Sequence, residues 1–301
     1  MLLTELPNAK SHIYNGLTIK VGYFTFRVTI KNRKAAQDFI QNYSEFPVLD
    51  DNDFYDFDVV IKPPSLLRKF LYPQVNFYCN EVPPFLPLPK EQAYAMLEWG
   101  MNWCIANYAH NFLIIHAAVI EKNNYSIILP GLPGAGKSTL TAALTTRGWR
   151  LLSDELTLIS LDDGSITPLS RPINLKNNSI DIIKAYSPSS QFSKVAHDTH
   201  KGSVALMKPP KLSVNKVSDV VKPRFIIFPK YEKNSTLMMK NVHKKDCFIE
   251  MIKHSFNYNI LGHEGFNTLT NLTQTIDCFS FVYSELDQAI EKFDSLVNIQ
   301  C

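Results

Sequence analysis

Hydrophobic and polar positions alternate along the first part of the chain and predict short strands. Large apolar residues recur at nearly every second position from Leu17 to Ile30, which is the period of a half-buried strand. Phe57 to Ile61 and Val75 to Tyr78 are two further short stretches of this kind. A proline-rich connector between residues 83 and 89 follows, and proline interrupts regular structure. We therefore predict a smaller β-rich N-terminal region over residues 1–90 and a larger domain over residues 91–301.

The hydrophobic pattern changes to a helical period after residue 90 and returns to a strand-like pattern from Phe112. Apolar residues from Glu91 to Tyr108 recur at helical spacing, which predicts an amphipathic helix with one buried stripe. Two apolar, β-branched runs, Phe112 to Ile120 and Tyr125 to Leu129, predict a pair of core strands joined by a polar turn. A helix rich in Ala and Leu over Thr139 to Thr146 and an apolar stretch over Arg150 to Leu161 come next. The order strand, loop, helix, strand is typical of a phosphate-binding α/β core.

Prolines divide the chain into short pieces beyond residue 165, and the periodicity weakens there. The remaining predictions are a strand over Phe225 to Phe228 and a C-terminal helix over Leu286 to Val297. Together these elements indicate an α/β fold with a mixed sheet.

Composition excludes several classes of protein. A formal charge of +3 over 301 residues, without a long run of like charges, does not predict a nucleic-acid partner. The five cysteines are odd in number and form no C-x-x-C pair, which argues against a disulfide framework and a zinc site. The N-terminus lacks a signal-peptide pattern, and the longest apolar run is too short to span a bilayer. We therefore expect a cytoplasmic protein with no membrane partner.

One motif carries specific chemistry, and it follows the second of the predicted core strands. It has the form G-x-x-x-x-G-K-S and is followed by Thr139; its residues are Gly131, Leu132, Pro133, Gly134, Ala135, Gly136, Lys137 and Ser138. The glycines allow consecutive backbone N–H groups to surround an anion at the positive end of the next helix. Lys137 is expected to reach the terminal phosphates of a nucleotide, and the Ser138 hydroxyl is expected to bind Mg²⁺. The motif predicts binding of a nucleoside triphosphate, ATP with Mg²⁺.

Two adjacent carboxylates, Asp154 and Glu155, interrupt the apolar stretch that follows the predicted helix. Neighbouring residues of a strand face opposite sides, so both can face a nucleotide only if the strand ends or bulges there. We assign Asp154 inward as general base and Glu155 to the metal or its water. His116 interrupts the first predicted core strand, and from the pattern alone it is either a core residue or a catalyst.

These residues occur in the order found in the HPr kinase/phosphorylase superfamily, which the chain resembles. The matching segments are the strand with His116, the loop from Gly131 to Thr139, the segment from Arg147 to Glu155, and Arg171. The chain also looks like the branch called HPr kinase-related kinase A, in segments that include Phe256-Asn257-Tyr258. The resemblance implies a P-loop kinase core of the phosphoenolpyruvate-carboxykinase type, with Asp154 as base and His116 supporting it. It also makes Arg171 the main candidate to steady the transferred phosphate, with Lys176 and Lys201 as weaker ones.

The leading hypothesis is an ATP- and Mg²⁺-dependent kinase that phosphorylates a Ser or Thr hydroxyl of a protein or peptide, with residues 1–90 helping to present it. HPr itself is not the favoured substrate, because the signature downstream of the active site in authentic HPr kinases is not recognisable here. Two alternatives stay open: a kinase for a sugar or amino-acid hydroxyl, and a nucleotide-binding switch without turnover. The resemblance also implies self-association into a homo-oligomer.

Overall fold

The computed structural model describes residues 1–50 and 52–298, and the chain divides into two compact units. Unit 1 comprises residues 1–108, 171–181 and 189–215, and unit 2 comprises residues 109–170, 182–188 and 216–301. Both units combine helices with sheets, so the protein belongs to the mixed α/β class. The predicted division at residue 90 stays a prediction, although unit 1 also takes in residues 91–108 and two later segments.

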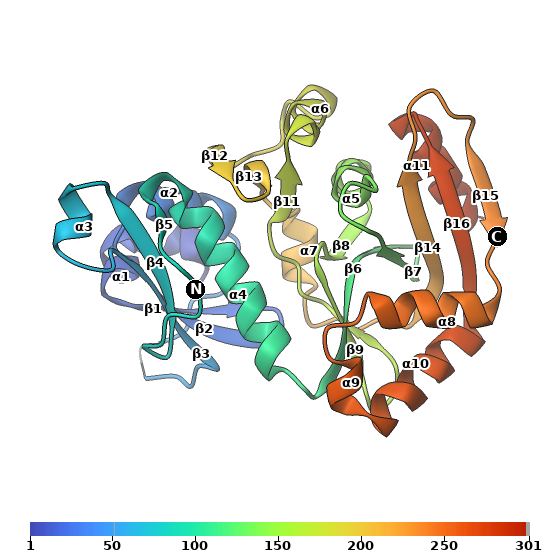
Figure 1. Cartoon of the computed structure of the whole chain (residues 1–301), viewed down its shortest axis with the longest axis horizontal. Coiled ribbons are helices and arrows are strands. Elements are labelled where there is room, and N and C mark those ends of the chain that lie inside the picture. Colours follow the sequence, from blue (N-terminus) through green and yellow to red (C-terminus); the bar gives the residue numbers. More distant parts are fainter. Residues whose placement is uncertain (51, 299–301) are drawn as a thin grey trace. The chain divides into compact units, whose positions relative to one another are not determined.

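A five-stranded sheet in the order β1-β2-β3-β4-β5 forms the centre of unit 1 (Figure 1). Its strands are β1 (Leu17–Val21), β2 (Phe24–Ile30), β3 (Phe57–Lys62), β4 (Gln74–Cys79) and β5 (Leu88–Pro89). The alternation between Leu17 and Ile30 is an antiparallel β1–β2 hairpin, whereas β2 and β3 run parallel. In β2 every second residue is buried, which confirms the prediction from its sequence period.

Unit 1 also contains helices and a second, three-stranded antiparallel sheet. The helical segments are η1 (Leu3–Glu5), α1 (Ala9–Asn15), α2 (Arg33–Asn42), α3 (Leu67–Phe70), η2 (Lys90–Gln92), α4 (Ala93–Tyr108) and α7 (Lys211–Asn215). The second sheet has the order β11-β13-β12, with β11 (Ile173–Lys176), β12 (Ala196–Thr199) and β13 (Gly202–Met207). Helix α6 (Asn178–Tyr186) crosses from unit 1 into unit 2. The sequence did not predict α2, although the Asn32 side chain caps it by accepting a hydrogen bond from the N–H of Ala35 (3.0 Å).

Helix α4 is the predicted helix, but it is not amphipathic in the predicted way. Its buried positions lie on several sides rather than on one stripe, and they include Glu98. The reason is that α4 packs against β3 and β4 on one side and against α2 and β13 on others, all within unit 1. Gly100 allows the closest of these contacts, because a Cβ at this position would lie 2.3 Å from the Phe77 ring of β4.

Unit 2 is built on an eight-stranded mixed sheet. Its strands follow the order β10-β9-β6-β7-β14-β16-β15, and β8 pairs with β6 beside β9. The bounds are β6 (Phe112–Lys122), β7 (Tyr125–Pro130), β8 (Arg150–Ser153), β9 (Leu156–Ser160), β10 (Ile166–Thr167), β14 (Pro223–Tyr231), β15 (Met238–Asn241) and β16 (Asp277–Tyr283). Strands β7, β14 and β16 run parallel, and the other pairs are antiparallel.

Helices cover both faces of this sheet (Figure 1). They are α5 (Lys137–Thr146), α8 (Lys244–Lys253), α9 (Tyr258–Leu261), α10 (His263–Thr275) and α11 (Leu286–Val297). Cys278 of β16 joins the core cluster that contains Met251 of α8 and Leu269 of α10. Phe281, three positions later and therefore on the opposite face, packs against Phe293 of α11 with ring centroids 5.3 Å apart. None of the helices within the described residues combines the length and apolar character needed to cross a bilayer.

The predictions for β6, β7, α5, β14 and α11 are confirmed, with longer bounds for most of them. The interpretation that regular structure is sparse beyond residue 165 was wrong for residues 223–297, where β15, α8, α10 and β16 complete the core of unit 2. Polar residues on the exposed sides of α8 and α10 hid their helical period in the sequence.

Candidate nucleotide-binding and catalytic site

The glycine-rich loop connects β7 to α5, as the motif predicts. Its first part is a turn in which the N–H of Ala135 donates to the carbonyl of Leu132 (3.1 Å). Pro133 and Gly134 are the central residues, and Gly134 has φ = 87°. Proline followed by a glycine with positive φ is the signature of a type II turn. The turn is exposed, whereas Lys137 at the start of α5 is buried.

The second part of the loop is fixed by two tyrosines on neighbouring strands. The Tyr283 hydroxyl donates to the carbonyl of Gly136 (3.0 Å), and the N–H of Tyr231 donates to the carbonyl of Ala135 (2.9 Å). Both carbonyls are therefore held against β14 and β16, while α5 begins directly after Gly136. The N–H groups of a first helical turn have no carbonyl one turn earlier to bond. This arrangement suits an anion at the N-terminus of α5.

We expect Gly136→Ala to disrupt the loop more than Gly134→Ala does. Both glycines have positive φ, 84° and 87°, so either substitution adds backbone strain of about 1–2 kcal/mol. Only at position 136 would the new Cβ also clash, because it would lie 2.5 Å from the Tyr283 hydroxyl oxygen and 2.8 Å from the Tyr231 Cβ. At position 134 nothing lies within 4 Å.

The measurement is calorimetric titration with ATP and Mg²⁺, together with thermal unfolding. Gly136→Ala should weaken binding at least tenfold relative to Gly134→Ala, since overpacking adds roughly 1–3 kcal/mol to the strain. Equal losses in the two variants would show that contact with the tyrosines does not shape the loop.

Three residues join the loop helix to the carboxylate segment. The Lys137 ammonium donates to the backbone carbonyl of Asp154 (2.8 Å). The Ser138 hydroxyl donates to Oδ2 of Asp154 at 3.4 Å, and the carboxylate is 5% exposed. Residues that stand sixteen or seventeen positions apart in the sequence are thus in direct contact.

Asp154 and Glu155 can both face a nucleotide only if the strand ends or bulges at these residues, and the strand does end there. Strand β8 ends at Ser153 and β9 begins at Leu156, so Asp154 and Glu155 lie in a bend between them. The Ser153 side chain fixes this bend, since its hydroxyl donates to the carbonyl of Leu156 (2.7 Å) and accepts from the N–H of the same residue (3.1 Å). Asp154 is buried and Glu155 is half-buried.

His116 lies on the same face of the sheet as α5. Its neighbours Ile115 and Ala117 belong to the core cluster under α8 and α10, so the side chain of His116 must point to the other face. His116 is paired with Leu156 across the β6–β9 ladder, two residues after Asp154. Its ring is half-buried, and the Phe256 ring lies 5.7 Å away. His116 and Asp154 therefore belong to one region of unit 2.

The segment from His254 to Asn257 lies along the edge of β6, which the sequence did not predict. The N–H of His116 donates to the carbonyl of His254 (2.7 Å), and the N–H of Phe256 donates to the carbonyl of Ile114 (2.9 Å). The buried Asn257 side chain continues the ladder, accepting from the N–H of Ile114 (2.9 Å) and donating to the carbonyl of Phe112 (2.8 Å). This segment holds the His116 end of β6 in place.

His254 is the residue of this region that sequence reasoning missed. Burial lowers the pKa of its imidazole; the positive charges of Lys137 and Lys253 lower it further, and Glu250 opposes them. The imidazole is 8% exposed and senses the charge of the loop lysine. A signal was present in the sequence, because His254 lies two positions before Phe256-Asn257-Tyr258, a segment that takes part in the resemblance.

The residues of the loop fit a magnesium nucleotide. Hydroxyl and carboxylate oxygens are the donors that Mg²⁺ prefers, and the Ser138 hydroxyl lies beside the bend that carries Asp154 and Glu155. Lys137 supplies a positive charge at the same helix start, where a triphosphate would carry its negative charge. The Ser138 hydroxyl and the Glu155 carboxylate, which lies in the same bend as Asp154, would hold the metal.

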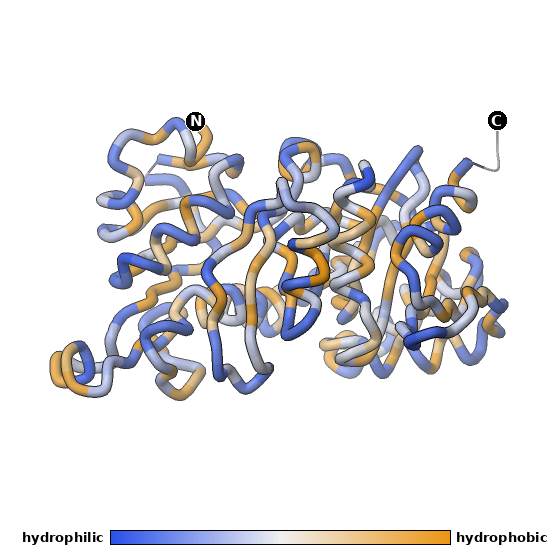
Figure 2. The backbone as a smooth tube through the Cα atoms, turned by 90° about the horizontal axis from the view of Figure 1, so that it is seen from above, coloured by the Kyte–Doolittle hydropathy of each residue, from blue (hydrophilic) through white to orange (hydrophobic). Residues whose placement is uncertain are grey.

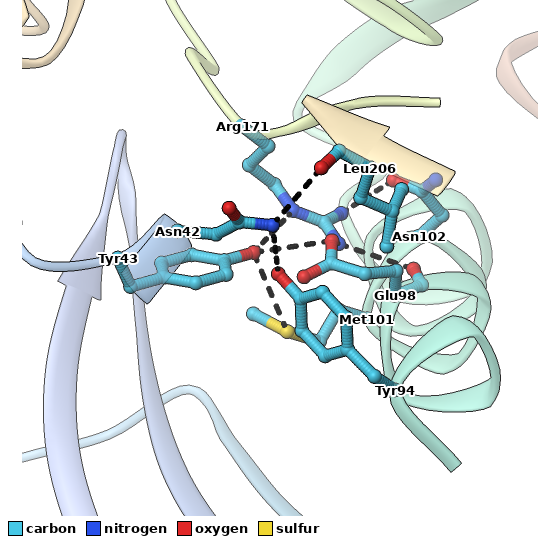
Figure 3. A network of polar contacts seen from close by, with 8 residues as sticks. All are labelled: Asn42, Tyr43, Tyr94, Glu98, Met101, Asn102, Arg171 and Leu206. Atoms are coloured by element: carbon cyan, nitrogen blue, oxygen red, sulfur yellow. Dashed lines mark hydrogen bonds and ion pairs between the residues drawn. The ribbon is translucent and has the colours of Figure 1, made fainter. Parts of the chain in front are cut away.

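Arg171 belongs to unit 1, where it is the centre of a buried polar network (Figure 3). Its guanidinium forms an ion pair with Glu98 (2.5 Å) and donates to the Glu98 backbone carbonyl (3.1 Å) and the Tyr43 hydroxyl (3.3 Å). It also donates to the Asn102 side chain. Burial by itself would lower the pKa of Arg171, but Tyr43 and Glu98 outweigh burial and raise it. Its predicted role in steadying a phosphate stays a prediction, and the observed contacts describe a structural ion pair.

The two weaker candidates, Lys176 and Lys201, also belong to unit 1. Lys201 follows β12 and lies over the Trp99 ring of α4, 5.2 Å from its centroid, and His200 packs against the same ring. Burial lowers the pKa of His200, and the charges of Lys201 and Lys176 lower it further. Positive charge is therefore concentrated near this turn of the second sheet.

Comparison with known proteins gives a likeness to solved structures at low similarity. No protein-family model matches the chain, and no curated protein matches it. Among solved structures it is similar to the HPr(Ser) kinase/phosphatase from Coxiella burnetii, with 12% identity and a TM-score of 0.28. The match covers 61% of this chain and 96% of that one.

Proposed function

We propose that this protein is an ATP- and Mg²⁺-dependent kinase that transfers the γ-phosphoryl group to a Ser or Thr hydroxyl of a protein or peptide. The observation that carries the proposal is the contact with Asp154 that Lys137 and Ser138 make at the start of α5, directly after the glycine-rich loop. The loop is sufficient to bind a nucleotide. Phosphoryl transfer to a hydroxyl also requires a base for the acceptor proton, and the buried Asp154 carboxylate beside the loop can serve as that base. The resemblance to HPr kinase-related kinases supports the same activity.

The proposed chemistry is a single phosphoryl transfer. The acceptor oxygen forms a bond to the γ-phosphorus while the bond from that phosphorus to the oxygen of ADP breaks, and the acceptor proton moves to the Asp154 carboxylate. Lys137 places positive charge beside the phosphates, and the amides at the start of α5 orient them. When bound, Mg²⁺ would offset the negative charge of the triphosphate.

His116 has a supporting role in this proposal. It lies on the α5 face of β6, near the bend that carries Asp154, and its backbone is held by the segment after α8. From there it can help to orient Asp154 or the acceptor hydroxyl. Glu155, in the same bend, is proposed as a metal or water ligand.

The test is labelling of a desalted cell lysate with γ-labelled ATP and Mg²⁺ in the presence of the purified full chain. Wild type and a Lys137→Ala variant are compared, and labelled products are separated by mass. We expect a labelled polypeptide in the wild-type reaction that is absent with Lys137→Ala, because that variant lacks the charge beside the phosphates. Phosphoamino-acid analysis of the product should give phosphoserine or phosphothreonine.

Two outcomes would replace the proposal. Label that appears only in a low-mass product would identify a small-molecule kinase. Lack of any labelled product, while wild type still binds ATP, would identify a nucleotide-dependent switch.

A further inference from the structure

The loop that connects β3 to β4, residues 63–73, is the most apolar exposed part of unit 1. We call it the α3 loop, after the short helix within it. It carries five large exposed side chains: Leu66 (82% exposed), Leu67 (66%), Phe70 (77%), Leu71 (55%) and Tyr72 (76%). Single exposed apolar residues are ordinary on protein surfaces, but a contiguous group usually marks an interaction site. Figure 2 shows the segment as a hydrophobic turn with hydrophilic residues between.

Local geometry places these side chains on one side of a helical turn. The backbone of Leu66 is already helical, and the N–H of Lys69 and of Leu71 donate to the carbonyls of Leu66 (3.2 Å) and Leu67 (2.9 Å). Positions 66, 67, 70 and 71 therefore share one side of the turn, and Arg68 and Lys69 occupy the other. No residue of α3 is buried, so the apolar side is not directed into the core of unit 1.

The charges of the α3 loop have a single sign. Lys62, Arg68 and Lys69 are exposed, and residues 59–80 contain no Asp or Glu. The ammonium groups of Lys62 and Lys69 lie beside the rings of Tyr78 and Phe70, at 4.6 and 5.4 Å from the ring centroids. The nearest acidic residues along the chain, Asp58 and Glu81, are at the opposite end of the β3–β4 hairpin. Lys62 stands four positions after Asp58 along the strand, roughly 13 Å away, and this distance exceeds the screening length at physiological salt.

We propose that the α3 loop is a membrane-contact segment that inserts its apolar side into the interface of an anionic lipid bilayer. Leu66, Leu67 and Phe70 would enter the boundary between headgroups and acyl chains, and Arg68 and Lys69 would contact the negative headgroups. Tyr72 is a residue type that favours this boundary. We expected no membrane partner from the sequence because it has no bilayer-spanning segment and no signal-peptide pattern. The α3 loop differs from both, since it would lie in the interface without crossing the bilayer.

A bilayer suits the loop better than a protein groove does, for a geometric reason. The apolar side chains are half to four-fifths exposed on one short turn, and no residue of α3 is buried. A fluid interface can surround such a turn, whereas protein hot spots are usually enclosed by a ring of further contacts. The absence of acidic residues from positions 59–80 matches the negative charge of the lipid surface.

The experiment is flotation of the full chain, without nucleotide, with vesicles of phosphatidylcholine alone or mixed with phosphatidylserine. Wild type should float with the anionic vesicles, weakly with the neutral ones, and less as salt is raised. A Leu66→Ser/Leu67→Ser/Phe70→Ser variant should lose at least tenfold in affinity. An Arg68→Gln/Lys69→Gln variant should lose roughly fivefold for each charge and show a flatter salt dependence.

Leu86→Ser is the matched control, since Leu86 is an equally exposed leucine (85%) of unit 1 outside the α3 loop. It should bind vesicles like wild type. Because all substituted side chains are exposed, circular dichroism should be unchanged, and a loss of binding is then due to the altered surface and not to unfolding.

Lack of wild-type binding to anionic vesicles, or equal binding of the triple-serine variant, overturns the proposal. Binding of a soluble protein through the same residues, without vesicle binding, overturns the lipid assignment. Kinase activity enters none of these readouts, so the proposed function and this one can fail separately.

Discussion

Replacing Asp154 with Asn is expected to reduce phosphoryl transfer by roughly 10³-fold while changing ATP affinity little. Asn keeps the size and the polar contact with the Ser138 hydroxyl, which Asp154 now makes through Oδ2 at 3.4 Å. Asn cannot take the proton of the acceptor hydroxyl, so the loss should fall on the chemical step. The Lys137 contact should persist, because it is made to the backbone carbonyl of residue 154.

The measurement separates binding from chemistry. Single-turnover transfer of labelled phosphate to the acceptor from the lysate experiment gives the rate, and calorimetric titration gives the affinity for ATP. Glu155→Gln is the companion variant, because it removes the neighbouring carboxylate, which is proposed to hold the metal or its water, and keeps Asp154. Asp154→Asn should slow the transfer while ATP affinity is retained, whereas Glu155→Gln should weaken the binding of ATP with Mg²⁺. An Asp154→Asn variant that loses ATP affinity as Glu155→Gln does would assign Asp154 to the metal, and a fully active Asp154→Asn protein would remove the carboxylate from the mechanism.

Replacing Glu98 with Ala should be among the most destabilising substitutions in unit 1. Glu98 and Arg171 form an ion pair in which both side chains are almost fully buried, 4% and 7% exposed. Alanine would leave the guanidinium buried without its counter-charge, and this change typically costs about 3–5 kcal/mol. The Tyr43 hydroxyl would also lose the carboxylate to which it donates (3.1 Å). Figure 3 shows how these groups converge between α4 and the start of β11.

Hydrogen exchange of α4 provides a local measure of this loss, and thermal unfolding provides a global one. A Glu98→Leu/Arg171→Met double variant is the control, because removing both charges restores most of the stability lost in either single variant. Unchanged exchange of α4 in Glu98→Ala would mean that the pair does not stabilise unit 1. A double variant that is stable but impaired in phosphoryl transfer would instead support the predicted phosphate role of Arg171.

Local sequence signals were sufficient for the phosphate loop and the elements around it. The loop is specified by residues within a few positions of one another, such as Pro133 and Gly134 in the turn. Strands β6 and β7 are also specified by neighbouring residues, because a continuous β-branched apolar run predicts a strand that is buried on both faces. The antiparallel pairing of β6 with β7 also follows, since only a two-residue turn, Asn123-Asn124, connects them.

The helices between residues 244 and 275 could not be predicted by the same reasoning. In α10 the buried residues Gly265, Thr268, Leu269, Leu272 and Thr273 have the helical spacing, but several of them are small or polar. Such residues are buried because β6 and α8 offer them a surface, and this surface is absent from the local pattern.

The sequence by itself determined the chemistry that one short segment can perform, because a loop and a helix start need only consecutive residues to bind phosphate. Tertiary structure alone decided which distant groups meet there and elsewhere. It brought Asp154 into contact with Ser138, placed His254 near the charge of Lys137, and paired Arg171 with Glu98 across 73 positions. Contacts of this kind arise when whole helices and strands pack together. The two residues of such a contact are far apart in the sequence and share no hydrophobic period, so the contact could not be predicted from the sequence pattern.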